Sequence, residues 1–99
     1  MKLLTEKIKQ QLPKMYATDA DRNKHFVCKF FDPCGSWTWY VCEGQEQSDG
    51  DWLFYGLVDG FEKEWGYFSL SELETFRGQL GLGIERDIYF ENEPAEKYA

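Results

Sequence analysis

The sequence is poor in the residues and short motifs from which most enzyme active sites are built. Its 99 residues include one histidine, His25, which lies in a polar stretch with no identifiable acid to orient it as a general base. A Gly-x-Ser-x-Gly elbow, a phosphate-binding loop and a dinucleotide-binding fingerprint are all missing. Cys34 with His25 is the one pairing of nucleophile and base that the chain offers. We therefore expect a protein that is not an enzyme.

Long apolar runs are also missing. No stretch approaches the roughly 18 apolar residues of a membrane-spanning helix. The opening segment, residues 1–6, holds two leucines, whereas a signal peptide needs an apolar stretch of about 7–15 residues. These features predict a cytoplasmic protein that does not associate with a membrane.

Cysteine is sparse, and its number is odd. Cys28, Cys34 and Cys42 without a secretory signal predict reduced thiols instead of a disulfide framework. Together with His25 they could supply four ligands to zinc, but the chain lacks the Cys-x-x-Cys spacing typical of such sites. We expect no metal and no cofactor, with Cys28 and Cys42 buried as small apolar residues and Cys34 exposed in a turn.

Basic residues become scarce after residue 30. Residues 1–30 hold seven Lys or Arg against three acids, whereas residues 31–99 hold four against fifteen, and the formal net charge is −7. An acidic body of this kind repels nucleic acid and attracts basic proteins. We therefore expect a basic nucleic-acid-binding protein as the partner and no direct contact with nucleic acid.

Aromatic residues, in contrast, are abundant. They make up 18% of the chain, and all four tryptophans lie between residues 37 and 65. Alternating apolar positions predict strands at residues 26–31, 37–42, 52–58 and 61–68. A turn at residues 32–35, a hydrophilic loop at 43–51 and an Asp59-Gly60 hairpin would join them into an antiparallel meander. Residues 84–90 alternate again and predict a last strand.

Apolar spacing also predicts two helices. The first begins after Thr5 and ends before Pro13. The second begins at Ser69, where Ser69 and Glu72 fit a capping box, and runs to Gly78 or Gly81. Its expected apolar stripe consists of Leu70, Leu73, Phe76 and Leu80.

These elements predict a single α+β domain over residues 1–99. It would contain a mostly antiparallel sheet of four or five strands, a short N-terminal helix and one helix after the fourth strand. The first few residues and the C-terminal tail from about residue 92 are expected to be loose.

Three motifs follow one another along the chain. They are Trp37-Thr38-Trp39-Tyr40, Gly66-Tyr67-Phe68-Ser69-Leu70-Ser71-Glu72-Leu73 and Gly81-Leu82-Gly83-Ile84-Glu85-Arg86-Asp87. Together they resemble a small bacterial domain family of unknown function. Members of that family resemble cargo of plasmids, integrative elements and phage-related islands, often beside anti-restriction and DNA-maintenance genes. The resemblance brings no catalytic residue and no ligand.

Carboxylates recur in pairs spaced by two residues. The pairs are Asp49/Asp51, Glu62/Glu64, Glu85/Asp87 and Glu91/Glu93. In an extended segment each pair lies on one face about 6.6 Å apart, so a rigid sheet bearing such pairs resembles a phosphate backbone. With the resemblance, this favours a non-enzymatic domain that blocks the nucleic-acid channel of a CRISPR effector or restriction enzyme. The simpler alternative is a solvated acidic surface.

Arg86 supports a different hypothesis, a small-ligand or enzyme site. Alternation places Arg86 among apolar residues of the last strand, so its charge needs a partner. A structural arginine would bond a carboxylate such as Glu72, or backbone carbonyls, and lock the helix to the sheet. A functional one would bind an anion in a pocket rimmed by Trp37 or Trp39, with Cys34 as a further candidate.

Overall fold

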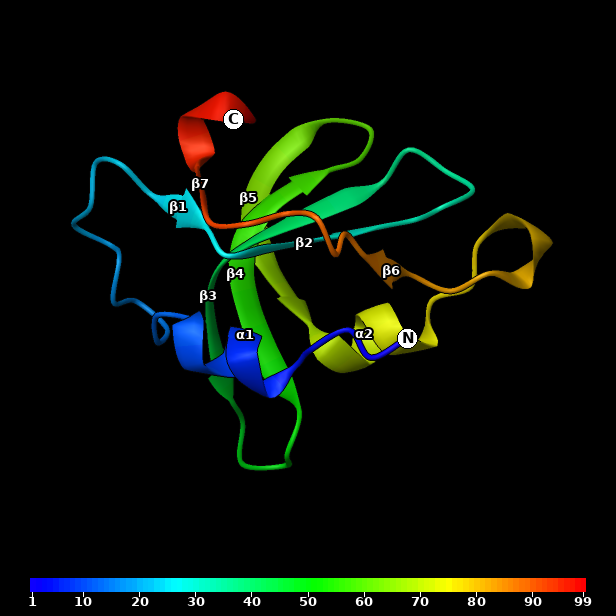
Figure 1. Ribbon diagram of the computed structural model, residues 1–99, viewed down its shortest axis with the longest axis horizontal. Coiled ribbons are helices and arrows are strands. Elements are labelled where there is room, and N and C mark those ends of the chain that lie inside the picture. The colour runs from blue at the N-terminus through cyan, green and yellow to red at the C-terminus, as the bar shows by residue number, and fades with distance from the viewer.

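The computed structural model describes all 99 residues and contains a five-stranded antiparallel sheet (Figure 1). The order in the sheet is β5-β4-β3-β2-β6. These strands are β2 (Cys28–Phe31), β3 (Thr38–Glu46), β4 (Trp52–Asp59), β5 (Lys63–Ser69) and β6 (Glu85–Arg86). Two short strands, β1 (His25–Phe26) and β7 (Glu93–Pro94), pair separately. The predicted α+β class is confirmed.

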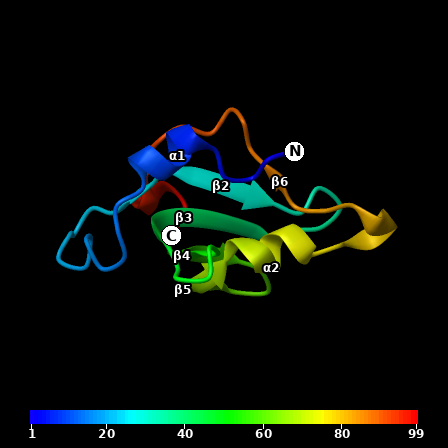
Figure 2. The same ribbon diagram turned by 90° about the horizontal axis from the view of Figure 1, so that it is seen from below.

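The sheet is strongly twisted. In Figure 1 the long strands β3, β4 and β5 run between the bottom and the top of the view, whereas β2 runs across it and β6 lies to the right of them. Seen from below in Figure 2, the N-terminal helix lies over β2, and the second helix lies beside β5. Antiparallel strands reverse direction at each turn, so the β3–β4 turn and the β4–β5 hairpin lie at opposite ends of β4.

Both helices are short and begin at a capping side chain. The hydroxyl of Thr5 accepts a hydrogen bond from a first-turn N–H of α1 (Glu6–Gln11) at 3.2 Å. The hydroxyl of Ser69 does the same for α2 (Leu70–Thr75), also at 3.2 Å. Both predicted N-caps are therefore confirmed. Neither helix has the length and the apolar run that a membrane crossing requires.

Two clusters of buried side chains hold the elements together. In the larger one, Ile8 of α1 and Leu73 of α2 meet Phe54 and Phe68 of the sheet. Burying one such side chain typically contributes about 1.5–3 kcal/mol. The smaller cluster consists of Phe26, Tyr40, Cys42, Leu57 and Ala95.

Both ends of the chain pack against the sheet instead of lying loose as the sequence predicts. Leu3 and Leu4 are buried in the larger cluster. At the other end, β7 pairs with β1, and the short 3-10 helix η2 (Ala95–Lys97) follows it. The ring of Tyr98 lies 4.6 Å from that of Tyr40. Aromatic and aliphatic contacts that are remote in sequence thus hold both ends.

Two predicted strands have different limits. The strand expected at residues 26–31 is divided, because β1 pairs with β7 while β2 pairs with β3. Strand β3 runs on into the loop expected at residues 43–51. A bulge between Val41 and Glu43 shifts its register, and Gly44 donates a hydrogen bond to the carbonyl of Pro13 at 3.0 Å. The N-terminal loop thus supports the polar end of β3.

Helix α2 ends at Thr75, earlier than predicted. Phe76 leaves the helix in an extended conformation, and its ring packs 6.2 Å from that of Trp39. The guanidinium of Arg77 donates to two carbonyl oxygens at the helix end, at 2.7 and 2.9 Å, so these groups are satisfied without another turn. Leu80, expected to continue the apolar stripe, is 88% exposed.

The prediction of a strand over residues 84–90 is wrong beyond Arg86, where β6 ends. There Asp87 begins a turn, in which its carboxylate accepts a hydrogen bond from the N–H of Tyr89 at 3.0 Å. Such an aspartate turn competes with extended structure and reverses the chain. Ile88 is consequently exposed and does not continue the face of Arg86.

Candidate protein-binding surface

Exposed aromatic and acidic side chains meet at the β4–β5 hairpin. Trp37, Val58, Phe61, Glu62 and Glu64 line a hollow of about 390 Å³ there. Phe61 is 94% exposed, and its ring meets that of Trp37 edge-on with 5.5 Å between the centroids. The lining contains two carboxylates and no basic side chain. This hairpin hollow is therefore an aromatic surface with negative charge.

The backbone of the hairpin brings these side chains together. Val58 and Glu64 are directly opposite in the β4–β5 register, so they share one face of the sheet. Gly60 makes room for Trp37, because a Cβ at this position would lie 2.5 Å from the indole ring. The N–H of Gly60 also donates to the carbonyl of Glu62 at 3.1 Å. The predicted Asp59-Gly60 hairpin is confirmed, although β5 starts only at Lys63.

The carboxylates of Glu62 and Glu64 have no hydrogen-bonding or ionic partner within the chain. Lys63 lies between them in sequence, but alternation directs it to the other face. Its ammonium group donates to the carbonyl of Tyr98 at 2.7 Å. The negative charge of the hairpin hollow is therefore free to act on another molecule.

The acidic pair Asp49/Asp51, at the other end of β4, is used within the fold. The carboxylate of Asp51 accepts from the hydroxyl of Ser71 at 2.6 Å, and from the N–H groups of Ser71 at 3.1 Å and Trp52 at 2.8 Å. These bonds lower the pKa of Asp51, and the bond from the Ser71 hydroxyl contributes most. Asp49 accepts from the N–H of Asp51 at 2.9 Å. This pair lies in a turn, not in an extended segment, and ties that turn to the start of α2.

Two members of the remaining pairs are also engaged within the chain. Asp87 lies 3.8 Å from the ammonium group of Lys29. Glu93 accepts a hydrogen bond from the hydroxyl of Tyr98. That bond is the main cause of a lowered pKa for Glu93 and raises the pKa of Tyr98 to about 12. These carboxylates hold the last segment of the chain in place.

The predicted carboxylates consequently do not form one continuous surface. Those without a partner in the chain are Glu62, Glu64, Glu85 and Glu91. Glu85 is on β6 at one edge of the sheet, whereas the hairpin lies beside β5 at the other. Glu91 lines a groove beside α1. Of these, the hairpin pair lines an aromatic hollow without basic side chains.

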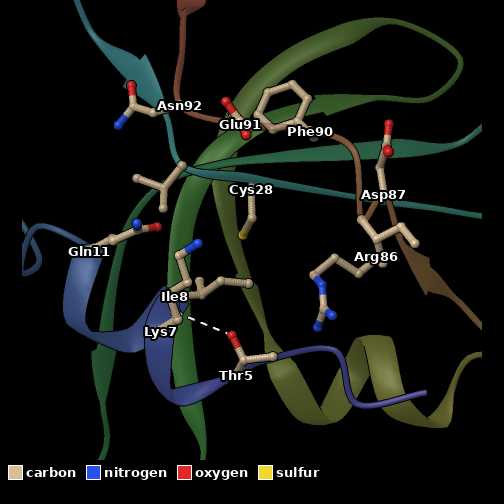
Figure 3. Close-up of a pocket in the computed structure, with 12 residues that line it drawn as sticks. Thr5, Lys7, Ile8, Gln11, Cys28, Arg86, Asp87, Phe90, Glu91 and Asn92 are labelled. Atoms are coloured by element: carbon tan, nitrogen blue, oxygen red, sulfur yellow. Dashed lines mark hydrogen bonds between the residues drawn. The ribbon is translucent and has the colours of Figure 1, made fainter.

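Arg86 borders the largest groove, a space of about 680 Å³ between α1 and residues 86–92 (Figure 3). Its guanidinium points toward the N-terminal segment and donates to the carbonyl of Leu3 at 3.0 Å and to that of Lys2. Arg86 thus bonds backbone carbonyls, one of the two kinds of partner predicted for a structural arginine, but these carbonyls belong to the segment before α1, and no bond to Glu72 is formed.

The predicted pocket of Arg86 with Trp37 or Trp39 does not form. Arg86 and Trp39 lie on the same face, but both are opposite Phe30, which is fully buried between them. Neither tryptophan lines the groove beside Arg86. Although Arg86 and Trp39 lie on the same face of the sheet, the side chain of Phe30 between them prevents a common pocket.

The burial predicted for Cys28 and Cys42 is confirmed, whereas Cys34, expected to be exposed, is half-buried. Cys28 and Cys42 are buried, and all three thiols are free. Cys28 borders the groove, but burial raises the pKa of its thiol to about 12, so it stays protonated and poorly nucleophilic at neutral pH. Cys34 is half-buried in the β2–β3 turn, where its N–H donates to the carboxylate of Asp32 at 3.0 Å.

A comparison with protein families gives a match over residues 3–99 to a protein of unknown function (DUF2958). The chain belongs to this family. The prediction of a small domain of unknown function is thereby confirmed. No curated protein and no solved structure matches the chain.

Glu43, which lies in the loop expected at residues 43–51, is 1% exposed and has a structural role that was not predicted. Its carboxylate accepts from the N–H groups of Tyr16 and Thr18, both at 2.9 Å, and from the hydroxyl of Thr18. Burial acts to raise the pKa of Glu43, but these hydrogen bonds together lower it. The only feature of the sequence that could have indicated this burial is the position of Glu43 directly after the apolar residues of the predicted strand.

Proposed function

We propose that this chain is a non-enzymatic, acidic protein-binding domain that inhibits a DNA-handling bacterial defence complex, either a CRISPR effector or a restriction enzyme. It would act in the cytoplasm by occupying a basic channel that otherwise holds nucleic acid. The observation that carries the proposal is the hairpin hollow, where free carboxylates of Glu62 and Glu64 adjoin the rings of Phe61 and Trp37.

An arginine or lysine side chain of the partner suits this hollow for two reasons. A cation over an aromatic ring gains about 0.5–1 kcal/mol at an exposed site and about 2 kcal/mol once desolvated. Carboxylates add charge-assisted hydrogen bonds, which are roughly twice as strong as neutral ones. Aromatic residues that become fully desolvated at an interface also carry much of its binding energy, and a partner seated on the hairpin would cover Phe61 and Trp37 in this way. Arginine-rich nucleic-acid channels offer many such side chains.

The charge of the whole domain supports the same kind of partner. A net charge of −7 accelerates encounter with a basic surface and disfavours binding of DNA by the domain itself. Glu85 and Glu91, whose carboxylates are also free, extend this negative field beyond the hairpin. Competition with DNA for one basic channel then follows from charge, without a catalytic step.

The experiment is affinity capture from a bacterial lysate by the tagged chain, at low salt and at several-fold higher ionic strength. We expect a nucleic-acid-binding complex that is recovered at low salt, lost at high salt and displaced by added duplex DNA. The double variant Glu62→Lys/Glu64→Lys should lose it.

The matched control is Glu46→Lys/Glu74→Lys, which changes the net charge equally at exposed positions away from the hairpin. This control should retain the complex. Equal loss in both double variants would contradict a role for the hairpin hollow. A captured complex that DNA does not displace would contradict charge mimicry.

Small-ligand binding is the second candidate, favoured by the groove beside α1. Lys7 and Arg86 border it together with Glu91 (Figure 3). An anionic molecule held there would remain bound at both salt concentrations and would be detected by mass spectrometry of the purified chain. Loss of that molecule in a Lys7→Glu variant would favour this candidate over the first.

A further inference from the structure

Strand β5 is the long, open edge of the sheet. It pairs with β4 through all seven of its residues, and no strand lies on its other side. No hydrogen bond from outside the sheet reaches a backbone group of residues 63–68. At the opposite edge, β6 has only two residues. An edge of this kind offers a row of free N–H and C=O groups to another strand.

One face of this edge is aromatic. Trp65 and Tyr67 project to the same side and are 38% and 54% exposed. Both contact Tyr55 of β4, with ring centroids 5.7 and 5.0 Å apart. The aromatic row therefore continues from β4 to the edge and stops there, where a further strand could extend it.

The residue order of β5 is suited to pairing with itself. Gly66 is the midpoint of the strand, so an antiparallel copy centred on Gly66 pairs all seven residues. In that register each Trp65 lies opposite the Tyr67 of the second copy. Lys63 faces Ser69, and Glu64 faces Phe68, so no like charges meet. Centring on Glu64 instead would place two carboxylates opposite each other, which is destabilising.

We infer that β5 is a self-association strand and that two copies of this chain form a two-fold dimer through antiparallel β5–β5 pairing about Gly66. The partner is a second copy because the sequence of the edge is complementary to its own reverse. Aromatic cross-strand pairs contribute about 0.2–1 kcal/mol each, and the two-fold axis produces two of them. The sheet then becomes continuous across the dimer.

Gly66 is also compatible with a close approach at the axis. A Cβ built at this position has no atom within 4 Å. A cysteine can therefore be placed there without displacing a neighbour, which makes the axis testable.

The first test is the solution mass of the untagged chain, measured by light scattering over a concentration series. We expect twice 11.7 kDa at high concentration. Trp65→Glu/Tyr67→Glu places like charges opposite each other twice and should give a monomer. Trp65→Lys/Tyr67→Glu removes the same rings but places opposite charges together, and it should restore the dimer.

The second test does not depend on those rings. In a Cys34→Ser background, Gly66→Cys should form an intermolecular disulfide under mild oxidation. Lys63→Cys should not, because the two substituted positions, one in each copy, would be about 20 Å apart along the paired strands, beyond disulfide reach.

A wild-type chain that is monomeric at all concentrations, with no Gly66→Cys crosslink, would overturn the inference. So would a dimer that both double variants leave unchanged. A monomer that captures a strand of a different protein along β5 would also show that self-pairing is wrong. None of these measurements needs the defence complex, so the dimer and the proposed function can fail separately.

Discussion

The two acidic turns at the ends of β4 are similar in composition but differ in use. In the β3–β4 turn, the carboxylate of Asp51 bonds Ser71 and Trp52 and so joins the turn to α2. In the β4–β5 hairpin, Glu62 and Glu64 make no internal bond and adjoin exposed aromatic rings. Equal spacing in sequence thus gives a structural carboxylate at one end and free carboxylates at the other.

The difference teaches that the number of nearby donors, and not the number of acids, decides whether a carboxylate is available. A helix start supplies free N–H groups to Asp51, whereas no helix begins beside the hairpin. Carboxylates with internal hydrogen bonds are therefore expected to affect the stability of the fold, and carboxylates without internal partners are expected to affect binding.

The largest effect is expected at Glu43, the most buried of the structural carboxylates. Glu43→Gln replaces an acceptor oxygen by an amide that faces N–H donors, so buried groups lose their partners. We expect a loss of about 3 kcal/mol in the free energy of unfolding, measured by urea denaturation. Glu46→Gln, at the exposed end of the same strand, should change it by less than about 0.5 kcal/mol. Similar small effects for both would contradict the role of Glu43.

Acid should weaken the fold through the same set of groups. Glu43, Asp51 and Glu93 have pKa values lowered in the folded chain from ordinary values of 4.5, 3.8 and 4.5. Their contribution is present above about pH 4.5 and is lost as the pH falls through the lowered values. Urea midpoints between pH 7 and pH 3 should fall mainly below pH 4.5. Glu43→Gln should show a shallower fall, and an equal fall would contradict this assignment.

A smaller loss is expected at the β3–β4 turn. Asp51→Ala removes the acceptor for Ser71 and Trp52, and Ser71→Ala removes the strongest donor. Each variant should lower the melting temperature, and the double variant should lower it by less than the sum, because both remove one interaction. Strict additivity of the two effects would contradict a shared bond.

The smallest effect on stability is expected at the hairpin. Glu62→Lys/Glu64→Lys removes no internal bond, so the free energy of unfolding should stay within about 0.5 kcal/mol of wild type. Circular dichroism and urea denaturation check this. A large destabilisation would show that these carboxylates are structural after all, like Asp51.

Sequence alone predicted the local features of this fold well. The caps at Thr5 and Ser69 and the Asp59-Gly60 hairpin depend on neighbouring residues, and all three occur. The extension of β3 and the burial of Glu43 depend on a loop more than 20 residues away, so no local pattern indicated them.

The candidate site was predictable in part for the same reason. The spacing of two residues between carboxylates indicated Glu62 and Glu64 as candidate contacts, but it indicated Asp49 and Asp51 equally. The two pairs differ in their internal bonds, the shortest of which joins Asp51 to Ser71 of α2, and the sequence does not show that α2 lies beside this turn. Likewise, a pocket of Arg86 with Trp37 or Trp39 was predicted, but the buried ring of Phe30 that separates Arg86 from Trp39 follows from the strand order and not from a local pattern. Whether the hairpin hollow binds a partner stays a prediction.

The most direct test of the central claim is an NMR titration of the ¹⁵N-labelled chain with a short arginine-rich peptide. We predict that the largest amide shifts occur at residues 58–64 and in the indole of Trp37, and that Glu62→Lys/Glu64→Lys abolishes them. The β3–β4 turn at residues 47–51 should shift little. Shifts of equal size at both turns, or an unchanged response in the variant, would contradict the distinction between structural and free carboxylates.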